Sequence, residues 1–567
     1  MTNWLFTRDG RDITIVRTLI QGIALCFIGF APLAEALYDP AREYLETPAV
    51  AARYPDPSVE VRTPAFAAGK TDFTSQDELI AFIDDLARRT PSLRVRIIGR
   101  SQENRAIPLL IFARPPAGGS DLQKNGRPTV LIIGQQHGNE PAGGEAALAL
   151  AAELSAELAS RSSSKWLDRV NVLIVPRANP DGAHHFVRGL VNGADVNRDH
   201  LLEGTPEGRA LGRVFTEYQP DVVLDCHEFG VKTRWLEKFG GLQRHDALIQ
   251  YATVSNLPRA LTDTAESMFR QPLVKALADA GLTQTWYYTT SYDPTDRVVS
   301  MGGVVPDTGR NIAGLRNAVS FLIETRGVGI GRAHFKRRVY THLTAMHSML
   351  DSTAANADAV LALGHTLRNG VAALAGKGDI VVAGVATATR NTLDLIDPDT
   401  GADKAIDVEW RSALTIDVRR KRARPFAYLL PASEAEAAKR LARLGATVLR
   451  LTEDGMMDGD RYRITRADEA KKDDVRRNDD EGVANIVRFE TAVEPARVAA
   501  KAGDFYVPLD QPLANVIAAA LEPETQSSYA ANHMLTLPQI AADQPTYLPL
   551  YRLPAAVQLP SVIWEAD

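Results

Sequence analysis

The stretch Thr129-Val-Leu-Ile-Ile-Gly134-Gln-Gln-His137-Gly-Asn-Glu140-Pro141 joins a short apolar run to a segment rich in alanine. The apolar run predicts a buried strand, and residues 144–158 predict a helix by composition and length. A strand, a turn and a helix in this order indicate a parallel sheet covered by helices. His137 and Glu140 stand three residues apart at the exit of the strand, where both side chains can point at one metal ion.

Further short apolar runs extend this sheet. They begin at Leu93, Ile107, Val170, Asp221 and Ala318. An amphipathic helix with a polar N-cap is predicted from Thr74 onward. The sequence therefore predicts an α/β fold with a mixed, largely parallel central sheet flanked by helices. Ligands of such sheets gather beyond the carboxyl ends of the strands, and the candidate residues lie there.

A second histidine follows another of these strands, in Leu224-Asp-Cys-His227-Glu. A histidine and a glutamate three residues apart are common on protein surfaces, so His137 and Glu140 alone are weak evidence. Two histidines with one carboxylate are the ligands of a catalytic zinc ion, whose fourth position is left to water. One Zn²⁺ per chain, held by His137, Glu140 and His227, is predicted.

Between these strands lie an isolated Arg188 and the sequence Asp195-Val-Asn197-Arg198. A guanidinium fork beside an amide suits a carboxylate, so Asn197 and Arg198 are candidates for binding the free C-terminus of a peptide. Arg188 is a candidate for stabilising the oxyanion that forms when water attacks a carbonyl. Asp195 is a candidate acceptor for the outer N–H of a ligating histidine.

The run Ser320-Phe-Leu-Ile-Glu324-Thr-Arg326 places a carboxyl group at the end of an apolar strand. Partly desolvated surroundings suit a general base, and Glu324 is the candidate. The alternative is a strand-end glutamate that pairs with Arg326.

Together these motifs resemble the zinc metallocarboxypeptidase family typified by carboxypeptidases A and B, over roughly residues 74–331. The chain looks like a secreted member of the bacterial type with a C-terminal extension. The resemblance implies hydrolysis of the C-terminal peptide bond of a peptide with a free C-terminus. It also implies that Glu324 deprotonates a water activated by zinc and then returns the proton to the leaving amine.

Two features of that family are harder to place. Its members close a tyrosine over the substrate, and Tyr292 is our choice here, with an aromatic core residue as the alternative. The pocket for the substrate side chain is expected from residues 301–311. Arg310 would favour an acidic side chain and Asp307 a basic one, unless the two neutralise each other.

Composition and the N-terminus indicate where the protein acts. A net charge of −6 gives no basic footprint, which argues against a nucleic-acid partner. Arginines precede the apolar run 18–31, and Ala34-Glu-Ala36 follows it, so residues 1–36 predict a signal peptide and export to the periplasm or the extracellular space. The alternatives are an uncleaved anchor or a buried helix. No later run is long enough for a membrane span, and the oligomeric state is left open.

The chain is expected to continue with an extended lead-in at 37–73, a catalytic domain at 74–350 and a smaller α+β C-terminal domain of unknown role at 351–567. A long helical stretch from Tyr340 to Ala375, short strands from Asp379 and Thr392 and a helix at 433–444 are predicted. The charged segment 466–481 predicts a solvated loop.

Two other functions fit the same residues. A zinc amidohydrolase would act on N-acyl amino acids or on γ-linked cell-wall peptides, which suits an exported protein. A catalytically inactive peptide-binding module would be expected to lack a metal ligand or the base, yet His137, Glu140, His227 and Glu324 are all present.

Overall fold

The computed structural model describes residues 38–114, 122–160, 162–291, 293–472, 485–539 and 544–565. The chain divides into two units, Met1–Leu37 and Tyr38–Asp567. The predicted signal peptide and Tyr292 both lie outside the described residues. Among the helices that are described, none has the length and apolar character needed to cross a bilayer.

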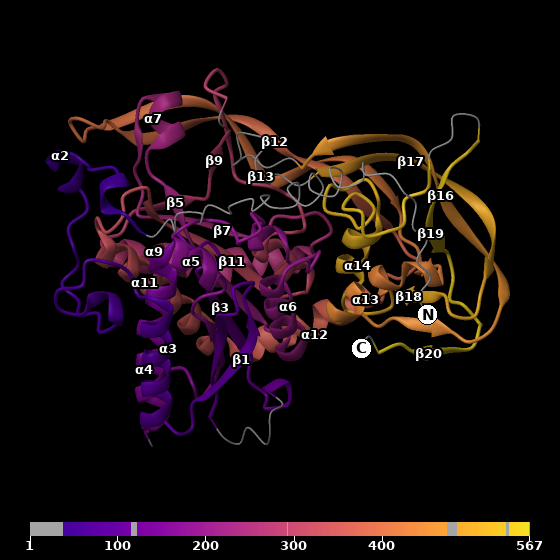
Figure 1. Ribbon diagram of the computed structural model, residues 1–567, viewed down its shortest axis with the longest axis horizontal. Helices are drawn as coiled ribbons and strands as arrows, with labels where there is room; N and C mark the ends of the chain where they lie inside the picture. Colours follow the sequence, from indigo (N-terminus) through magenta and orange to yellow (C-terminus); the bar gives the residue numbers. More distant parts are fainter. Residues whose placement is uncertain are drawn as a thin grey trace, which may run out of the picture. The chain divides into compact units, whose positions relative to one another are not determined.

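An eight-stranded mixed sheet, in the order β1-β2-β4-β3-β5-β11-β7-β8, carries the first part of the second unit (Figure 1). Its strands are β1 (Arg94–Arg100), β2 (Ala106–Phe112), β3 (Thr129–Gly134), β4 (Asn171–Val175), β5 (Val222–Gly230), β7 (Ala247–Tyr251), β8 (Gln284–Trp286) and β11 (Val319–Val328). The pairs of β3 with β4 and β5, of β5 with β11 and of β7 with β8 are parallel, and the others are antiparallel. The predicted mixed α/β fold is confirmed.

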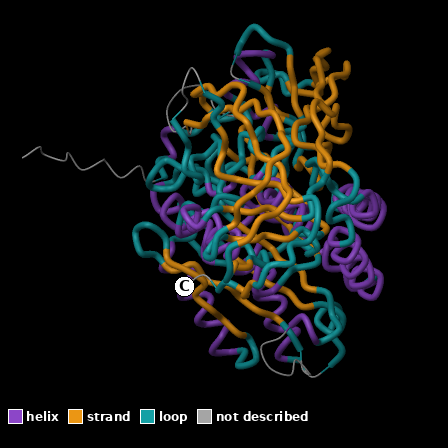
Figure 2. Tube along the Cα trace, turned by 90° about the vertical axis from the view of Figure 1, so that its right-hand side faces the viewer, coloured by secondary structure: helices purple, strands orange, loops and turns teal. Residues whose placement is uncertain are grey.

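Helices cover both faces of this sheet, as Figure 2 shows with helices in purple beside strands in orange. They are α3 (Gln76–Arg89), α4 (Pro141–Ala159), α5 (Pro180–His185), α6 (Pro206–Tyr218), α7 (Thr233–Phe239), α8 (Arg259–Thr264), α9 (Gln271–Asp279), α10 (Gly309–Leu315) and α11 (Phe335–Ala355). The predicted helix at the start is α3, and the Ser75 and Glu78 side chains form a capping box at its N-terminus.

Helix α4 lies close to β5, which pairs in parallel with β3 up to Gly134 and Cys226. A Cβ atom on Gly143 would lie 2.7 Å from the Cβ of Cys226, so a glycine is needed at this contact. Cys226 is fully buried there. The close approach sets Glu140, the residue before α4, beside β5.

The lead-in contains only short helical turns, among them α2 (Pro48–Ala51), in the part that is described. It is tied to the sheet by Glu46, whose carboxylate forms an ion pair with Arg326 and accepts a hydrogen bond from His334 at 2.9 Å. Burial by itself raises the pKa of Glu46, but the His334 hydrogen bond and the Arg326 charge outweigh it and lower the pKa to about 2. Arg326, the alternative partner of Glu324, thus has an ion pair with the lead-in.

We expect Glu46→Gln to destabilise the protein at neutral pH. A folded pKa below the unfolded value means that the stabilisation is fully present above about pH 4.5 and is lost as the pH falls toward 2, and it amounts to about 3 kcal/mol. Thermal melts of variant and wild type should therefore differ at pH 7 and converge toward pH 2. Glu60→Gln, an exposed position in the same lead-in, is the matched control. A difference that stays constant with pH would contradict the linkage.

The C-terminal part is built on long antiparallel ribbons. Strands β12 (Asp379–Ile396) and β13 (Asp403–Ala423) join β6 (Leu242–Gln243), β9 (Thr289–Thr290) and β10 (Val298–Ser300) in a five-stranded sheet, ordered β6-β12-β13-β10-β9. In Figure 1 the β12–β13 ribbon runs from the C-terminal elements toward α7. The ribbon therefore shares a sheet with strands from before residue 351.

A seven-stranded sheet in the order β17-β16-β19-β14-β18-β15-β20 completes this part, and all its pairs are antiparallel. Its elements are β14 (Ala427–Leu430), β15 (Leu449–Leu451), β16 (Gly455–Lys471), β17 (Asn485–Ala500), β18 (Phe505–Pro508), β19 (Tyr547–Leu553) and β20 (Ser561–Ile563), with α13 (Ala435–Arg443) and α14 (Ala514–Leu521).

Two regions of this part differ in detail from what the sequence indicated. The helical stretch expected from Tyr340 to Ala375 consists of two helices, α11 and α12 (Ala357–Ala372), with a break at Asn356, and residue 351 lies inside α11. Residues 466–471 of the expected loop form the end of β16, because main-chain hydrogen bonds to β17 hold a strand that buries few side chains. Residues 473–484 lie outside the described range. The assignment of 351–567 as a separate domain stays a prediction.

Candidate active site

His137, Glu140 and His227 converge at the carboxyl ends of β3 and β5. The Nδ1 atoms of the two histidines lie 3.0 Å apart. Glu140 places Oε1 2.9 Å from Nδ1 of His137 and Oε2 2.9 Å from Nδ1 of His227. All three residues are buried, and one ligand atom from each lies within 4.8 Å of the others, as in a group that could hold a metal ion.

The turn that carries His137 is held tightly against α5. A Cβ atom on Gly138 would lie 1.8 Å from the carbonyl carbon of Gly182, so no other residue fits at Gly138 without moving the backbone. Helix α5 itself begins at Asn179, whose side chain accepts the N–H of Gly182 at 2.8 Å. The Gly138-Asn139 pair between His137 and Glu140 thus helps to position these two candidate ligands.

Each histidine has a carboxylate on its outer nitrogen. Asp195 Oδ1 lies 3.0 Å from Nε2 of His137, in the place that the sequence predicted. Asp225 Oδ1 lies 2.8 Å from Nε2 of His227. Such partners fix the orientation of a ligating imidazole and make it a stronger ligand. Asp225 was missed, although its position two residues before His227 on one strand puts both side chains on the same face.

We expect Asp225→Asn to weaken zinc binding by about 10–100-fold, the usual cost of losing an outer partner of a ligating histidine. The asparagine keeps the size of the side chain but removes the charge that orients the His227 N–H. Competition with a chelating dye measures the affinity, and Asp458→Asn, at an exposed aspartate on β16, is the control. An unchanged affinity would mean that Asp225 does not support the metal ligand.

The charges around the histidines suit a divalent cation. Burial by itself raises the pKa of Glu140, but the charge and hydrogen bonds of His137 and His227 hold it well below its usual range. Burial lowers the pKa of His227, yet Asp225 and Glu140 outweigh this and raise it to about 10. The same carboxylates that favour a proton on His227 would favour a metal ion in its place. With that proton displaced, Glu140, Asp195 and Asp225 with the Arg188 guanidinium would leave two negative charges around neutral imidazoles. The donor set therefore fits a Zn²⁺ ion.

Arg188 lies against the ligands. One guanidinium nitrogen is 3.2 Å from Oε1 of Glu140 and 3.2 Å from Nδ1 of His137, and the other is 2.9 Å from Oδ2 of Asp195. Its side chain is 29% exposed, so it faces both the ligands and the solvent side. Its role toward an oxyanion stays a prediction.

Asn197 and Arg198 follow Asp195 in a short 3₁₀ turn, in which the Asp195 side chain accepts the N–H of Asn197 at 2.8 Å. Asn197 Nδ2 lies 3.2 Å from Nε2 of His227, and its Oδ1 accepts the N–H of Gly309 at 2.7 Å. Asn197 thus lies directly beside the candidate metal ligands, and the Arg198 guanidinium donates to the Asn197 carbonyl at 2.8 Å. Binding of a substrate carboxylate by these residues stays a prediction.

Glu324 lies beside His227. Strands β5 and β11 are parallel and pair these two residues in register, so their side chains are on the same face of the sheet. Glu324 is buried within β11, which continues to Val328, and not at the end of the strand as the sequence indicated. The structure brings the candidate base to the predicted group, and its catalytic role stays a prediction.

Residues 79–293 match the family model described as zinc carboxypeptidase. Carboxypeptidase 2 of Trichophyton equinum is 27% identical over 493 residues, which cover 86% of this chain and 88% of that protein. Residues 79–293 of this chain are thus similar to the zinc carboxypeptidase family. Glu324 lies beyond the residues that the family model matches, whereas the similarity to carboxypeptidase 2 extends over most of the chain.

The chain is also similar to two other proteins that are named carboxypeptidases. The catalytic chain of human carboxypeptidase N is 30% identical over 138 residues, which are 22% of this chain and 29% of that one. A crystal structure of a metallo-carboxypeptidase from Burkholderia cenocepacia matches with a TM-score of 0.38 and 19% identity, covering 50% of this chain and 70% of that chain.

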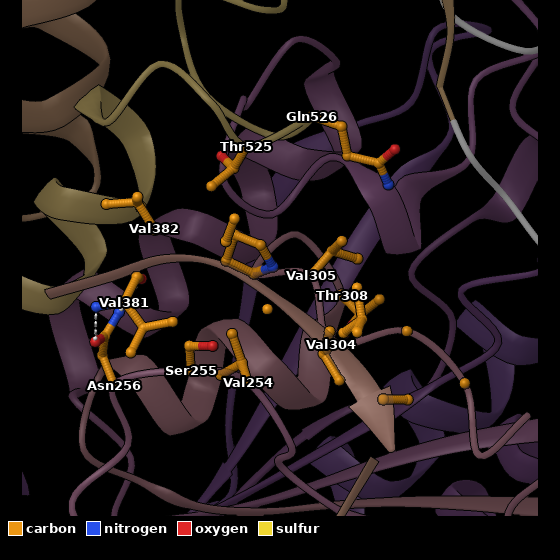
Figure 3. Close-up of a pocket in the computed structure, with 18 of the residues that line it drawn as sticks. Val254, Ser255, Asn256, Val304, Val305, Thr308, Val381, Val382, Thr525 and Gln526 are labelled. Carbon is orange, nitrogen blue, oxygen red and sulfur yellow. Dashed lines mark hydrogen bonds between the residues drawn. The ribbon is translucent and has the colours of Figure 1, made fainter. Parts of the chain in front are cut away.

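A cavity of about 890 Å³ adjoins the candidate metal ligands, and Figure 3 shows part of its lining. Asn197, Arg198 and Arg310 are among the residues that line it. Arg310 is buried and donates to the carbonyl of Gly303 at 3.2 Å. Asp307 is fully buried, forms an ion pair with Lys472 at 2.5 Å and accepts the Ser527 hydroxyl at 3.0 Å. Lys472 therefore neutralises Asp307, which the sequence paired only with Arg310.

Proposed function

We propose that this chain hydrolyses the C-terminal peptide bond of peptides, with one zinc ion held by His137, Glu140 and His227. The observation that carries the proposal is the contact between the two parts of the site. Asn197 lies 3.2 Å from the ligating His227 and, with Arg198, lines the adjoining cavity. If the substrate's C-terminal carboxylate is bound there, the last peptide bond of the substrate lies next to the zinc site.

A zinc ion in this site supplies a Lewis acid that lowers the pKa of a bound water and polarises a carbonyl. Glu324, on the same face as His227, takes a proton from the attacking water and later gives it to the leaving amine nitrogen. Arg188 stabilises the negative charge that develops on the carbonyl oxygen. Arg198 and Asn197 fix the free carboxylate, and Asp195 and Asp225 keep the two imidazoles oriented.

The protein is proposed to act outside the cytoplasm. Residues 1–36 have the charged, apolar and small-residue segments of a signal peptide. N-terminal sequencing of protein recovered from the periplasm or the medium should then begin at Leu37. Recovery with the complete N-terminus from the membrane fraction would indicate an anchor.

Mass spectrometry of peptide products tests the function. The purified, zinc-loaded protein is expected to shorten an α-linked hexapeptide one residue at a time from its C-terminus. Cleavage of a γ-linked cell-wall peptide or an N-acyl amino acid, with the hexapeptide intact, would indicate the amidohydrolase instead. Binding of zinc and of peptides without any cleavage would indicate an inactive binding module.

A further inference from the structure

Asp307 is a buried carboxylate near the cavity, and the proposed mechanism gives it no role. Its neighbours Pro306 and Thr308 line the cavity, whereas Asp307 is fully buried and is not among the lining residues. Its Oδ2 atom forms an ion pair with Lys472 at 2.5 Å and accepts the Ser527 hydroxyl at 3.0 Å. Asp307 is therefore bound by the C-terminal part and does not face the substrate.

Lys472 and Ser527 are the partners of Asp307 among the described residues. The second carboxylate oxygen, Oδ1, is buried and has no hydrogen-bond partner in the described part of the chain. Lys472 directly follows β16 and its side chain is only 10% exposed, while Ser527 follows α14 and is fully buried. A buried carboxylate that loses its counter-ion is strongly destabilised, so the position of Asp307 depends on these two side chains.

Two residues after Asp307, the same segment holds Asn197. The N–H of Gly309 donates to Asn197 Oδ1 at 2.7 Å. A side-chain amide accepts only at its oxygen, so this bond leaves Nδ2, with its two N–H groups, as the end that can donate to a substrate. Asn197 lines the cavity and lies 3.2 Å from the candidate ligand His227. The main chain at Gly309 thus sets the orientation of the amide that is proposed to bind the substrate carboxylate.

Little free space surrounds Gly309. A Cβ atom on this residue would lie 2.7 Å from Oδ2 of Asp225, so the main chain is packed against the carboxylate that holds His227. Only Thr308 separates Gly309 from Asp307. A displacement of Asp307 would therefore move the Gly309 N–H and change the orientation of the amide that accepts its hydrogen bond.

We propose that Lys472 and Ser527 of the C-terminal part position Asn197 for the substrate carboxylate, through Asp307 and the Gly309 N–H. The inference rests on the proposed function, since it takes Asn197 as part of the carboxylate site. Lys472 and Ser527 are positioning residues, because each acts through Asp307. The C-terminal part then contributes to binding of the substrate's free C-terminus.

Calorimetric titration of the zinc-loaded Glu324→Gln variant tests the inference without requiring turnover. Two hexapeptides of identical sequence serve as probes, one with a free C-terminal carboxylate and one with a C-terminal amide. The parent is expected to bind the free peptide more tightly. Adding Lys472→Met, which removes the charge, should lower this preference by at least about 10-fold, the lower end of what a hydrogen bond to a charged group contributes. The affinity for the amidated peptide should change little, whereas a general loss of structure would weaken both peptides alike.

Lys501→Met is the matched control, since Lys501 is an exposed lysine of the C-terminal part that also pairs with an aspartate, Asp454. It should bind both peptides like the parent. If Lys472→Met melts early, Ser527→Ala removes the neutral partner of Asp307 and should lower the preference in the same direction. An unchanged preference in a folded variant would overturn the inference alone. Equal binding of the two peptides by the parent would overturn the proposed carboxylate site, and the inference with it.

Discussion

Glu324→Gln is expected to lower kcat by about 10²–10⁴-fold while the bound zinc stays at one ion per chain. The amide has the size and shape of the carboxyl group but cannot take a proton from water. Because Glu324 is in register with His227 and is not among the three converging ligands, its change should leave the metal site intact. Steady-state kinetics together with metal analysis of the same sample measure both quantities.

Two outcomes would contradict this assignment. Loss of zinc in Glu324→Gln would mean that the residue supports or ligates the metal. Unchanged kcat would mean that another group takes the proton. Glu494→Gln, at a glutamate on the C-terminal strand β17, is the matched control and should retain both zinc and activity.

His227→Ala is expected to weaken zinc binding by more than about 100-fold, because loss of an outer partner alone already costs about 10–100-fold. The substitution removes the Nδ1 atom that faces both His137 and Glu140, and it leaves Asp225 without its imidazole. Hydrolysis should fall to the background level with the metal. Metal analysis after dialysis against a weak chelator measures the loss.

The control for this variant is His347→Ala, which removes a histidine that pairs with Glu153 at the surface and should keep both zinc and activity. A His227→Ala protein that retains one tightly bound zinc ion per chain would show that the metal lies elsewhere. Either conclusion about the metal requires that the His227→Ala protein is folded, as judged by its melting curve.

The fold around the site was predictable because its strands are buried on both faces. β3 and β4 consist mainly of apolar residues, and β5 and β11 begin with mainly apolar runs, so a short window of sequence identifies each of them. The ligands were predictable for the same reason. His137 lies three residues after the end of β3, and His227 lies in β5 soon after its apolar start, next to the end of β3.

The C-terminal ribbons were much less predictable. The sequence indicated two short strands within β12, because residues such as Thr389 and Arg390 between them are exposed and show no apolar alternation. Main-chain hydrogen bonds to β13 continue through this region whatever the side chains are. Main-chain hydrogen bonds to β17 hold the end of β16 in the same way.

Contacts between distant segments could not be predicted at all. The pairing of Asp307 with Lys472 and of Glu46 with Arg326 joins residues that are more than a hundred positions apart. Nothing local in the sequence distinguishes these charges from solvated ones. The C-terminal wall of the cavity was missed for this reason, since Val382 and Ala518 meet the catalytic side only in the folded chain.

The most direct test of the central claim compares two peptides of identical sequence, one with a free C-terminal carboxylate and one with a C-terminal amide. The zinc-loaded protein is predicted to release the last residue of the free peptide, with kcat/KM for the amide lower by at least about 100-fold, since a neutral amide offers the Arg198 guanidinium no opposite charge. Equal cleavage of the amidated peptide, or cleavage at an internal bond of both, would contradict the assignment of this site to a carboxypeptidase.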